Sequence, residues 1–310
     1  MSRLTHSSGG FARSLQMSSA RFFAFVEGGL DRPFFDRLIA GVCGPRAIKH
    51  QVIAVREIPG SAGGKIALLS LFRQFRSSGR LLSTAFGKTM VCAFFADKDT
   101  DDFSRTQLRS AHLFYTKTYD LEAHLFSCGD LQRALADSCG LTLQQAKAII
   151  PSQNGWLVDV ATKWKDWTIL CLISQTKRVN CGCTYDRASA VNINPLGPTD
   201  VAALESFKSK LSPLLGLSRH DFDSLFLKVE RRLTVALNSG QPLRYFKGKW
   251  LLHVLQRQLE TSNRPADSVV NSAGDKVTTA LLSQVANHAG CTCCAPFAPG
   301  LAGLIAHVLQ

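Results

Sequence analysis

Three acidic residues of this chain follow predicted strands in a pattern that suits metal chemistry. Glu27 comes directly after the apolar run 21–26, and Asp97 and Asp99 come directly after the apolar run 88–96. Because open α/β sheets bind ligands at the carboxyl ends of their strands, we expect the three carboxylates to meet in one crevice. Clustered carboxylates repel one another unless a cation screens them, and hard oxygen ligands suit Mg²⁺ or Mn²⁺. The pattern therefore predicts a divalent-metal site.

The acidic segment at residues 97–102 (DKDTDD) has a second interpretation. Asp-rich stretches are common in turns and at helix starts, and we interpret Asp101 and Asp102 in that way. An Asp-x-Asp segment can direct both carboxylates to one ion if the chain bends as it leaves the strand. The pairing with Glu27 is what favours a metal site over an ordinary turn.

The elements around these residues predict an α/β fold. Short apolar runs rich in β-forming residues favour buried strands, and apolar residues at helical spacing favour helices. We predict strands at 21–26, 51–58, 88–96 and 111–116, and helices at 31–42, 65–75 and 120–126. Buried strands that alternate with helices indicate a largely parallel sheet flanked by helices.

The pattern changes after residue 128, where helical spacing dominates. Helices are predicted at 131–150, 155–175, 201–215, 220–237, 249–260 and 275–288, and loops at 178–198 and 291–300. The stretch 155–175 is ambiguous because it contains several β-branched residues. The predicted organisation is a flexible tail at 1–20, a catalytic domain at 21–128 and a mainly helical accessory or dimerisation region at 129–310.

The composition describes a globular and basic chain of 310 residues, 45% hydrophobic and 19% charged, with a net charge of +13. Residues 1–128 carry 17 basic and 10 acidic side chains and the remainder carry 19 and 13, so the excess marks no basic tail. Such a charge favours a polyanionic partner, and a solvated basic surface is the alternative. No apolar run is long enough to cross a bilayer and no hydrophobic signal segment begins the chain, which predicts a cytoplasmic protein without a membrane partner.

Ten cysteines without a secretion signal indicate reduced thiols, most of them small core residues. Two groups are candidates for a zinc site if the fold brings them together. They are Cys181 with Cys183, and Cys291 with Cys293 and Cys294. Neither group has the two-residue spacing typical of zinc knuckles.

Two segments of the first domain resemble the Toprim signature. FAFVEGGLDRPFF (23–35) and FFADKD (94–99) are similar to the glutamate after the first strand and the Asp-x-Asp after the third in Toprim domains of primases, topoisomerases and OLD-family nucleases. YDLEAHLF (119–126) and YFKGKWLLHVL (245–255) resemble the D-x-E-x-x-L segment and the late Gly-Lys helix of the DUF4435 branch of Toprim-like proteins. The effector subunit of the PARIS anti-phage system, which partners an OLD-type ATPase, belongs to this branch.

This resemblance implies a Mg²⁺-dependent endonuclease (or one dependent on Mn²⁺). It implies catalytic roles for Glu27, Asp97, Asp99 and Glu122, metal binding by the first three, and supporting roles for Asp31 and Asp120. Glu122 has an alternative as an ordinary carboxylate near a helix N-terminus. His124, beside it in sequence, either approaches the site or is a structural histidine.

The resemblance also implies a biological setting. It favours RNA such as tRNA over DNA as the substrate of a toxic anti-phage effector that forms a homodimer and is inhibited or activated by an ABC/OLD-type ATPase. The alternative from another class is a non-catalytic regulatory or nucleic-acid-binding module that serves this ATPase.

Four lysines are candidates for contacts with nucleic-acid phosphates. Lys65 follows a Gly-rich loop that superficially resembles a P-loop, but the loop is one residue short and Ile66 replaces the required Ser or Thr, which argues against an ATPase. Lys98 lies between the two aspartates. Lys247 and Lys249 alternate with aromatic residues, as in single-strand binding sites, and a helix that buries Trp250 is the alternative.

Overall fold

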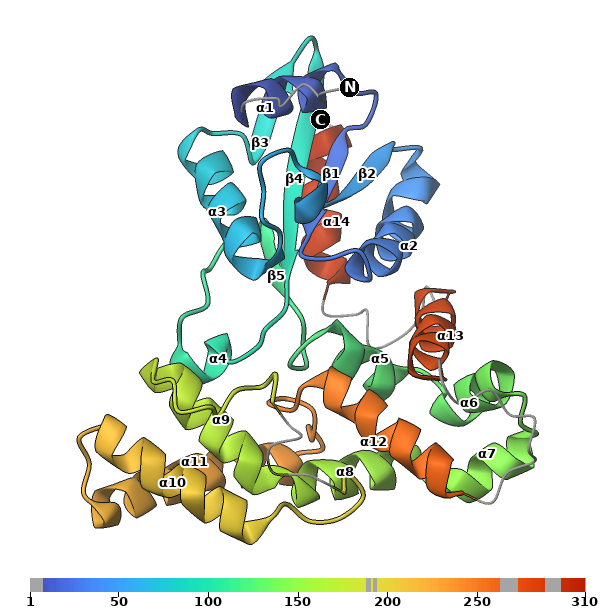
Figure 1. The fold of residues 1–310 in the computed structure, drawn as a ribbon. Coiled ribbons are helices and arrows are strands. Elements are labelled where there is room, and N and C mark those ends of the chain that lie inside the picture. The colour runs from blue at the N-terminus through green and yellow to red at the C-terminus, as the bar shows by residue number, and fades with distance from the viewer. Residues whose placement is uncertain (1–7, 188–190, 192–193, 263–272, 288–296, 310) are drawn as a thin grey trace, which may run out of the picture. The chain divides into compact units, whose positions relative to one another are not determined.

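The chain forms two compact units, which are described separately. The computed structural model describes residues 8–187, 191, 194–262, 273–287 and 297–309. Unit 1 comprises Met1–Asp97, Leu108–Thr116 and Leu282–Gln310, and unit 2 comprises Lys98–Gln107 and Lys117–Leu281. The sheet belongs to unit 1, and the described elements of unit 2 are helices (Figure 1). The chain therefore passes from one unit to the other inside the Asp-x-Asp segment.

Three parallel strands form the centre of unit 1. β1 (Phe22–Val26) lies between β2 (His50–Ala54) and β4 (Lys88–Ala96). The register pairs Val26 with Ala54 of β2 and with Phe95 of β4, so the three strands end at one edge of the sheet. Every residue of β1 is buried, as its continuous apolar sequence predicts for a strand that is covered on both faces. The predicted α/β class with a largely parallel sheet is confirmed.

The second edge of β4 pairs with two strands in succession. β3 (Leu82–Ala85) pairs antiparallel with the first half of β4, and β5 (Leu113–Tyr115) pairs parallel with the last residues of β4. The sequence does not predict β3, because its residues are exposed or half-buried and form no apolar run. The turn between β3 and β4 consists of Phe86 and Gly87, both with positive φ, which is the backbone that a two-residue hairpin requires.

One face of the sheet packs on α3 (Gly64–Ser77). The rings of Phe25 and Phe94 stack with centroids 4.8 Å apart, and the ring of Phe75 on α3 contacts both edge-on at 5.5 and 5.9 Å. These aromatic side chains bury a large apolar area and give the core of this face its fixed geometry.

The N-terminal segment adds a second helix to the same face. α1 (Ser8–Met17) forms where the sequence predicts a flexible tail at 1–20. Leu15 is buried in the core of this face, and the ring of Phe11 contacts the ring of Phe25. A short Ser- and Gly-rich helix is marginal by itself, so contacts with the sheet stabilise it.

The other face of the sheet packs on α2 (Asp31–Cys43) and α14 (Ala298–Leu309). The ring of Phe35 on α2 lies 4.2 Å from the ring of Phe95 on β4. The sequence predicts an irregular segment at 291–300, but α14 begins at Ala298 and buries apolar residues at helical spacing from Leu301 onwards. A C-terminal helix thus completes the sheet unit, although the sequence groups it with the helical region.

Two short 3-10 helices follow elements of unit 1. η1 (Gly44–Arg46) follows α2, and η2 (Val55–Glu57) follows β2. The strand predicted at 51–58 therefore ends earlier, at Ala54, and the residues that follow form the 3-10 helix η2.

Unit 2 is built from helices, which confirms a mainly helical region after the sheet. They are α4 (Asp101–Ser104), α5 (Leu121–Cys128), α6 (Leu131–Cys139), α7 (Leu143–Ile149), α8 (Gln153–Lys163), α9 (Lys165–Lys177), α10 (Val201–Leu214), α11 (Arg219–Asn238), α12 (Gly248–Thr261) and most of α13 (Ala273–Asn287). α9 lies at the centre of its neighbours α8, α10 and α11. Its eight successive residues Trp167–Ser174 are all buried, so this helix is enclosed on all sides, and the ambiguous stretch 155–175 is helical.

Two of the predicted helices are each divided into two. The segment 131–150 breaks at Gly140, which has a φ of 64° and ends α6, and the hydroxyl of Thr142 then caps α7. The segment 155–175 covers α8 and α9, which meet at Trp164. Helical spacing continues through both breaks, so the pattern alone does not reveal them.

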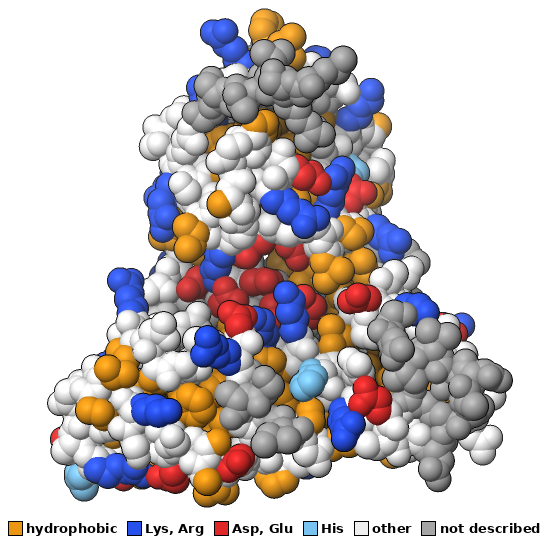
Figure 2. All heavy atoms as spheres, in the orientation of Figure 1, with side chains coloured by type: hydrophobic (Ala, Val, Ile, Leu, Met, Phe, Trp, Pro, Cys, Tyr) orange, Lys and Arg blue, Asp and Glu red, His pale blue; other side chains and the backbone are white. Residues whose placement is uncertain are grey.

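Lys and Arg side chains are distributed over the visible face of the molecule (Figure 2). This agrees with the even division of the +13 net charge along the sequence. Among the helices of the described residues, none is long and apolar enough to cross a membrane.

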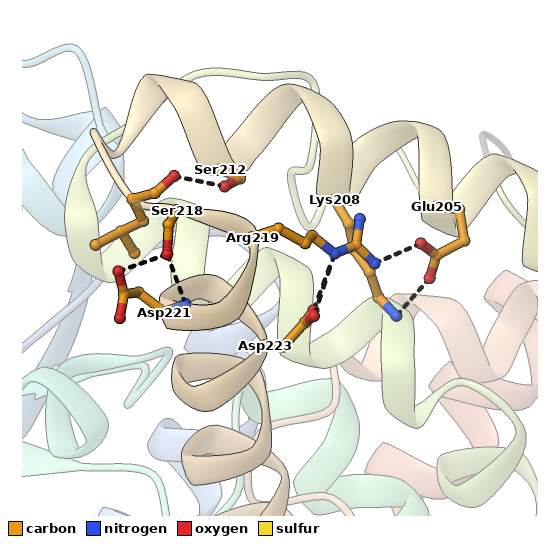
Figure 3. A network of polar contacts seen from close by, with 8 residues as sticks. Glu205, Lys208, Ser212, Ser218, Arg219, Asp221 and Asp223 are labelled. Atoms are coloured by element: carbon orange, nitrogen blue, oxygen red, sulfur yellow. Dashed lines mark hydrogen bonds and ion pairs between the residues drawn. The ribbon is translucent and has the colours of Figure 1, made fainter.

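Polar side chains tie α10 to α11 near the turn that joins them (Figure 3). Arg219 at the start of α11 bonds Glu205 of α10 at 2.7 Å and Asp223 one turn later at 3.2 Å. Lys208 contacts the same Glu205 at 2.8 Å, and the hydroxyl of Ser218 caps α11. Exposed ion pairs contribute little to stability, so this network orients the hairpin while the apolar residues hold it.

Candidate active site

Glu27 and Asp97 lie side by side at the carboxyl edge of the sheet in unit 1. Glu27 follows β1 and Asp97 follows β4, and the pairing of Val26 with Phe95 brings the two strand ends together. The Oε1 atom of Glu27 accepts a hydrogen bond of 2.8 Å from the backbone N–H of Asp97. Both residues are half-buried. A rigid sheet therefore fixes the backbone of two carboxylates that solvent still reaches.

Asp31 orients the loop that follows Glu27. Its Oδ2 atom accepts a hydrogen bond of 2.7 Å from the backbone N–H of Gly28, and Asp31 is also the first residue of α2. A carboxylate in the first turn of a helix is favoured by the helix dipole. The contact joins the end of β1 to the start of α2, which limits the positions open to Glu27.

A cation that the sequence pattern does not single out lies beside this loop. Arg56 belongs to η2, which follows β2 at the same edge of the sheet as Glu27. A Cβ on Gly29 would lie 2.0 Å from the Nη2 atom of Arg56, and a Cβ on Gly63 would lie 3.0 Å from the Cβ of Arg56. Glycine at both positions leaves room for this side chain. The predicted strand 51–58 includes Arg56, whereas β2 ends at Ala54. The sequence therefore does not show that Arg56 lies beyond the end of the strand.

Asp99 begins a bend in unit 2 directly after the strand. Its φ is 48°, a left-handed conformation that Asp tolerates better than most residues, and its N–H donates to the carbonyl of Tyr119 at 2.7 Å. Asp99 belongs to unit 2 with Glu122, whereas Glu27 and Asp97 belong to unit 1. A single residue separates Asp97 from Asp99, so the chain bends within the Asp-x-Asp segment.

Asp120 clamps two helix N-termini together within unit 2. Its Oδ1 atom accepts the N–H of Ala123 at 2.8 Å, which caps α5, and both carboxylate oxygens accept the N–H of Gly248 at 3.0 Å, where α12 begins. A Cβ on Gly248 would lie 2.2 Å from the backbone nitrogen of Ala123, so the contact requires glycine. Burial and the neighbouring Glu122 raise the pKa of Asp120 to about 8, against the effect of these hydrogen bonds. The geometry gives Asp120 a structural role, and it explains why glycine precedes Lys249 at the start of α12.

Glu122 and Lys249 face each other because of this clamp. They are the second residues of α5 and α12, and the Nζ atom of Lys249 lies 4.0 Å from Oε1 of Glu122. The Lys249 side chain is 65% exposed, while that of Glu122 is 14% exposed. Glu122 is thus a partly shielded carboxylate at a helix N-terminus with a cation above it, an arrangement that suits either a catalytic group or an ordinary ion pair.

Lys98 is buried, although it lies between two candidate metal ligands. Its ammonium group donates to the carbonyl of Lys117 and lies 3.9 Å from Asp102, whose carboxylate also pairs with Arg244 at 3.0 Å. Burial lowers the pKa of Lys98 to about 8, and Asp102 opposes this effect. These contacts tie down the loop after β4, so Lys98 is positioned to hold the backbone rather than to reach a substrate.

The remaining candidate lysines occupy different surroundings. Lys65 is the second residue of α3 in unit 1, and its ammonium group lies 5.7 Å from the centre of the Tyr115 ring. Lys247 precedes α12 in unit 2 and forms an ion pair with Asp186. The ion pair of Lys247 thus lies within unit 2, and the cation–π contact of Lys65 lies within unit 1.

The carboxylates of this site fit a hard divalent cation. Mg²⁺ commonly binds through one or two carboxylates and keeps several waters, and Glu27 and Asp97 are two carboxylates of unit 1 that could provide such ligands. The described residues contain no group of three or more His, Cys, Asp or Glu side chains placed to hold one metal. The expectation that Glu27, Asp97 and Asp99 form one group of three ligands is therefore not seen among the described residues.

Of the cysteine and histidine candidates that the structure describes, Cys183 and His124 are buried. Cys181 and Cys183 are free thiols, and burial raises the pKa of the Cys183 thiol. The second cysteine group, at 291, 293 and 294, lies outside the described residues. His124 is buried on α5, and burial together with the charge of Lys117 lowers its pKa to about 4, which keeps it neutral.

No protein-family model matches the chain, and no curated protein shows significant similarity to it.

Proposed function

We propose that this chain is an endonuclease dependent on Mg²⁺ or Mn²⁺, with Glu27, Asp97, Asp99 and Glu122 as its catalytic carboxylates. The observation that carries the proposal is the pair formed by Glu27 and Asp97 at the ends of adjacent parallel strands, linked by a hydrogen bond. A net charge of +13 supports a polyanionic substrate, because neutralised phosphates release their counterions.

Each residue has a defined task in this proposal. Asp97 and Asp99 bind the cation, and Glu27 either assists them or exchanges a proton with the attacking water. When bound, the ion supplies charge neutralisation at the phosphate and makes a bound water more acidic. Arg56, beside the Gly28–Gly29 loop, binds a phosphate oxygen of the substrate through its planar guanidinium group.

The resemblance to the DUF4435 branch of Toprim-like proteins supports a more specific form of the proposal. In that form the enzyme is a cytoplasmic toxic effector of anti-phage defence, cleaves structured RNA such as tRNA in preference to DNA, acts as a homodimer and is controlled by an OLD-type ATPase.

The direct test compares Glu27→Gln and Asp97→Asn with the wild type on tRNA, single-stranded RNA and plasmid DNA in the presence of Mg²⁺ or Mn²⁺. Each variant is expected to lose roughly 10³-fold or more of its cleavage rate, because removal of one member of a catalytic group disables the group. Asp36→Asn is the matched control, since Asp36 is an exposed carboxylate of unit 1 that pairs with His50.

Two results would contradict the proposal. One is cleavage by both variants at the rate of the wild type. The other is the absence of cleavage by the wild type on every substrate and of any toxicity on expression, which would favour a regulatory module that acts through a partner ATPase. Sequencing of RNA ends after induced expression in cells separates RNA from DNA activity.

A further inference from the structure

Unit 2 contains a pocket of about 400 Å³ that the proposed reaction does not yet use. Two tyrosines, Tyr119 and Tyr185, form part of its wall, and two cations, Arg178 and Lys247, line it with polar residues that include Asn180. A pocket of this size that combines aromatic walls with a few convergent polar groups has the general character of a ligand site.

The pocket is connected to the acidic residues of the same unit through its wall. The carbonyl oxygen of Tyr119 accepts the N–H of Asp99, and Asp120 follows Tyr119 directly. Lys247 directly precedes Gly248, whose N–H binds the carboxylate of Asp120. Two lining residues, Tyr119 and Lys247, are therefore the sequence neighbours of Asp120 and Gly248.

The aromatic wall is rigid. Tyr185 stacks between Tyr119 at 4.5 Å and Trp250 at 5.1 Å, measured between ring centroids. The hydroxyl of Tyr185 donates to the carbonyl of Tyr245 at 3.0 Å, and the indole N–H of Trp250 donates to the carbonyl of Tyr185 at 2.8 Å. With both faces and both polar ends engaged, Tyr185 cannot easily move into the pocket, so the space persists without a ligand.

The position of Arg178 is fixed by its backbone. It ends α9 with a φ of 56°, its N–H donates to the carbonyl of Gln175, and the next residue, Val179, donates to the carbonyl of Ser174 at 2.9 Å. This locked turn directs an arginine towards the pocket from a helix end that is otherwise held in place.

The charges of the pocket favour an anion. Lys247 pairs with Asp186, whose side chain is 81% exposed, whereas Arg178 forms no ion pair with any residue that the structure describes. Two cations thus face one carboxylate. Asp186 binds the ammonium group of Lys247, which an incoming anion would also use. Because the Asp186 side chain is exposed, breaking this ion pair costs little free energy.

We propose that this pocket binds a backbone phosphate of the nucleic-acid strand. Arg178 and Lys247 hold the phosphate oxygens, and Asp186 competes with the phosphate for Lys247. The assignment rests on the proposed nuclease function, because a strand held here becomes a substrate only if the catalytic carboxylates of the chain act on it.

The test measures binding of a short fluorescein-labelled single-stranded RNA to the full chain in EDTA, so that no cleavage occurs. Arg178→Gln and Lys247→Met are each expected to weaken binding about 10-fold and to reduce the salt dependence by about one phosphate contact. Asp186→Asn is expected to strengthen binding, since it releases Lys247. Lys228→Ala, an exposed lysine of α11 outside the pocket, is the matched control and should weaken binding by less than about 2-fold.

The outcomes separate this inference from the nuclease proposal. If Arg178→Gln and Lys247→Met bind like Lys228→Ala while the wild type cleaves, the pocket assignment is wrong and the nuclease stands. Loss of binding by these two variants in a chain that neither cleaves nor is toxic on expression would support the pocket and refute the nuclease. Weaker binding by Asp186→Asn would overturn the assignment, as would saturating inorganic phosphate that leaves RNA binding and its dependence on Arg178 unchanged.

Discussion

Glu27 in unit 1 and Asp120 in unit 2 are carboxylates that both accept backbone N–H groups, yet the two units hold them differently. Glu27 is half-buried at a strand end and accepts the N–H of Asp97. Asp120 is 4% exposed and accepts N–H groups from Ala123 and Gly248. Glu27 is therefore accessible to solvent at the edge of the sheet. Asp120 is instead buried and links the N-termini of α5 and α12 through hydrogen bonds.

The difference teaches that residue type and position at the end of an element do not decide a carboxylate's role. The degree of burial decides it, because a buried carboxylate whose oxygens are engaged by backbone N–H groups has little capacity left for an ion. Two predictions test this contrast, and a third tests the effect of burial on His124 of the helical unit.

The largest effect is expected from Gly248→Ala. The added Cβ would lie 2.2 Å from the backbone nitrogen of Ala123 and 2.6 Å from Oδ1 of Asp120, so α12 must move away from α5. We expect a loss of about 3 kcal/mol or more in the free energy of unfolding, measured by urea denaturation. Gly41→Ala in α2 is the control, because nothing lies within 4 Å of its Cβ position and a gain of up to about 1 kcal/mol is expected. Equal stability of Gly248→Ala and wild type would disprove the clamp.

A smaller effect is expected from Asp120→Asn compared with Glu27→Gln. The amide of Asn keeps one oxygen, which can accept from Ala123 and Gly248 as Oδ1 does, but its NH₂ group takes the place of Oδ2 and faces the N–H of Gly248 at close range. This should destabilise the fold by about 2 to 3 kcal/mol. Glu27→Gln keeps an oxygen for the N–H of Asp97 and should change stability by less than about 1 kcal/mol while it abolishes cleavage. The contrast between the units fails if thermal denaturation shows equal losses for both variants.

The smallest effect concerns pH and His124. Its folded pKa of about 4 lies below the ordinary value of 6.5, because burial and the charge of Lys117 disfavour the protonated ring. As the pH falls from 6.5 towards 4, the unfolded chain takes up a proton that the folded chain does not, so folding stability decreases. His124→Gln should remove on the order of 2 kcal/mol of this decrease by pH 5, measured as the difference in unfolding free energy between variant and wild type. Parallel pH profiles would show that His124 is not held neutral.

The central strands could be predicted because their signal is local. The strand predicted at 88–96 coincides with β4, and the one predicted at 21–26 with β1 within one residue, since parallel strands covered on both faces must be continuously apolar. β3, α1 and α14 could not be assigned in this way. β3 is an exposed hairpin strand, and the two helices depend on contacts with a sheet whose strands lie elsewhere in the sequence.

The candidate site could also be predicted only in part. Because Glu27 and Asp97 follow predicted strands, parallel pairing alone brings them together, and the structure places them in hydrogen-bond contact. Arg56 escaped prediction because a 3-10 turn replaces the end of its predicted strand. The burial of Lys98 is equally invisible in the sequence, since Asp102 and the carbonyl of Lys117 meet it only after the loop folds.

By itself the sequence determined the class of this protein, the central strands and the carboxylates that end them, because periodicity and strand order are local properties of the chain. Only the tertiary structure decided that Glu27 is accessible to solvent and that Asp120 links two helices. Asp120 owes its role to Gly248, which lies 128 residues further along the chain. The roles of these residues depend on burial and on hydrogen-bond partners that only folding brings together.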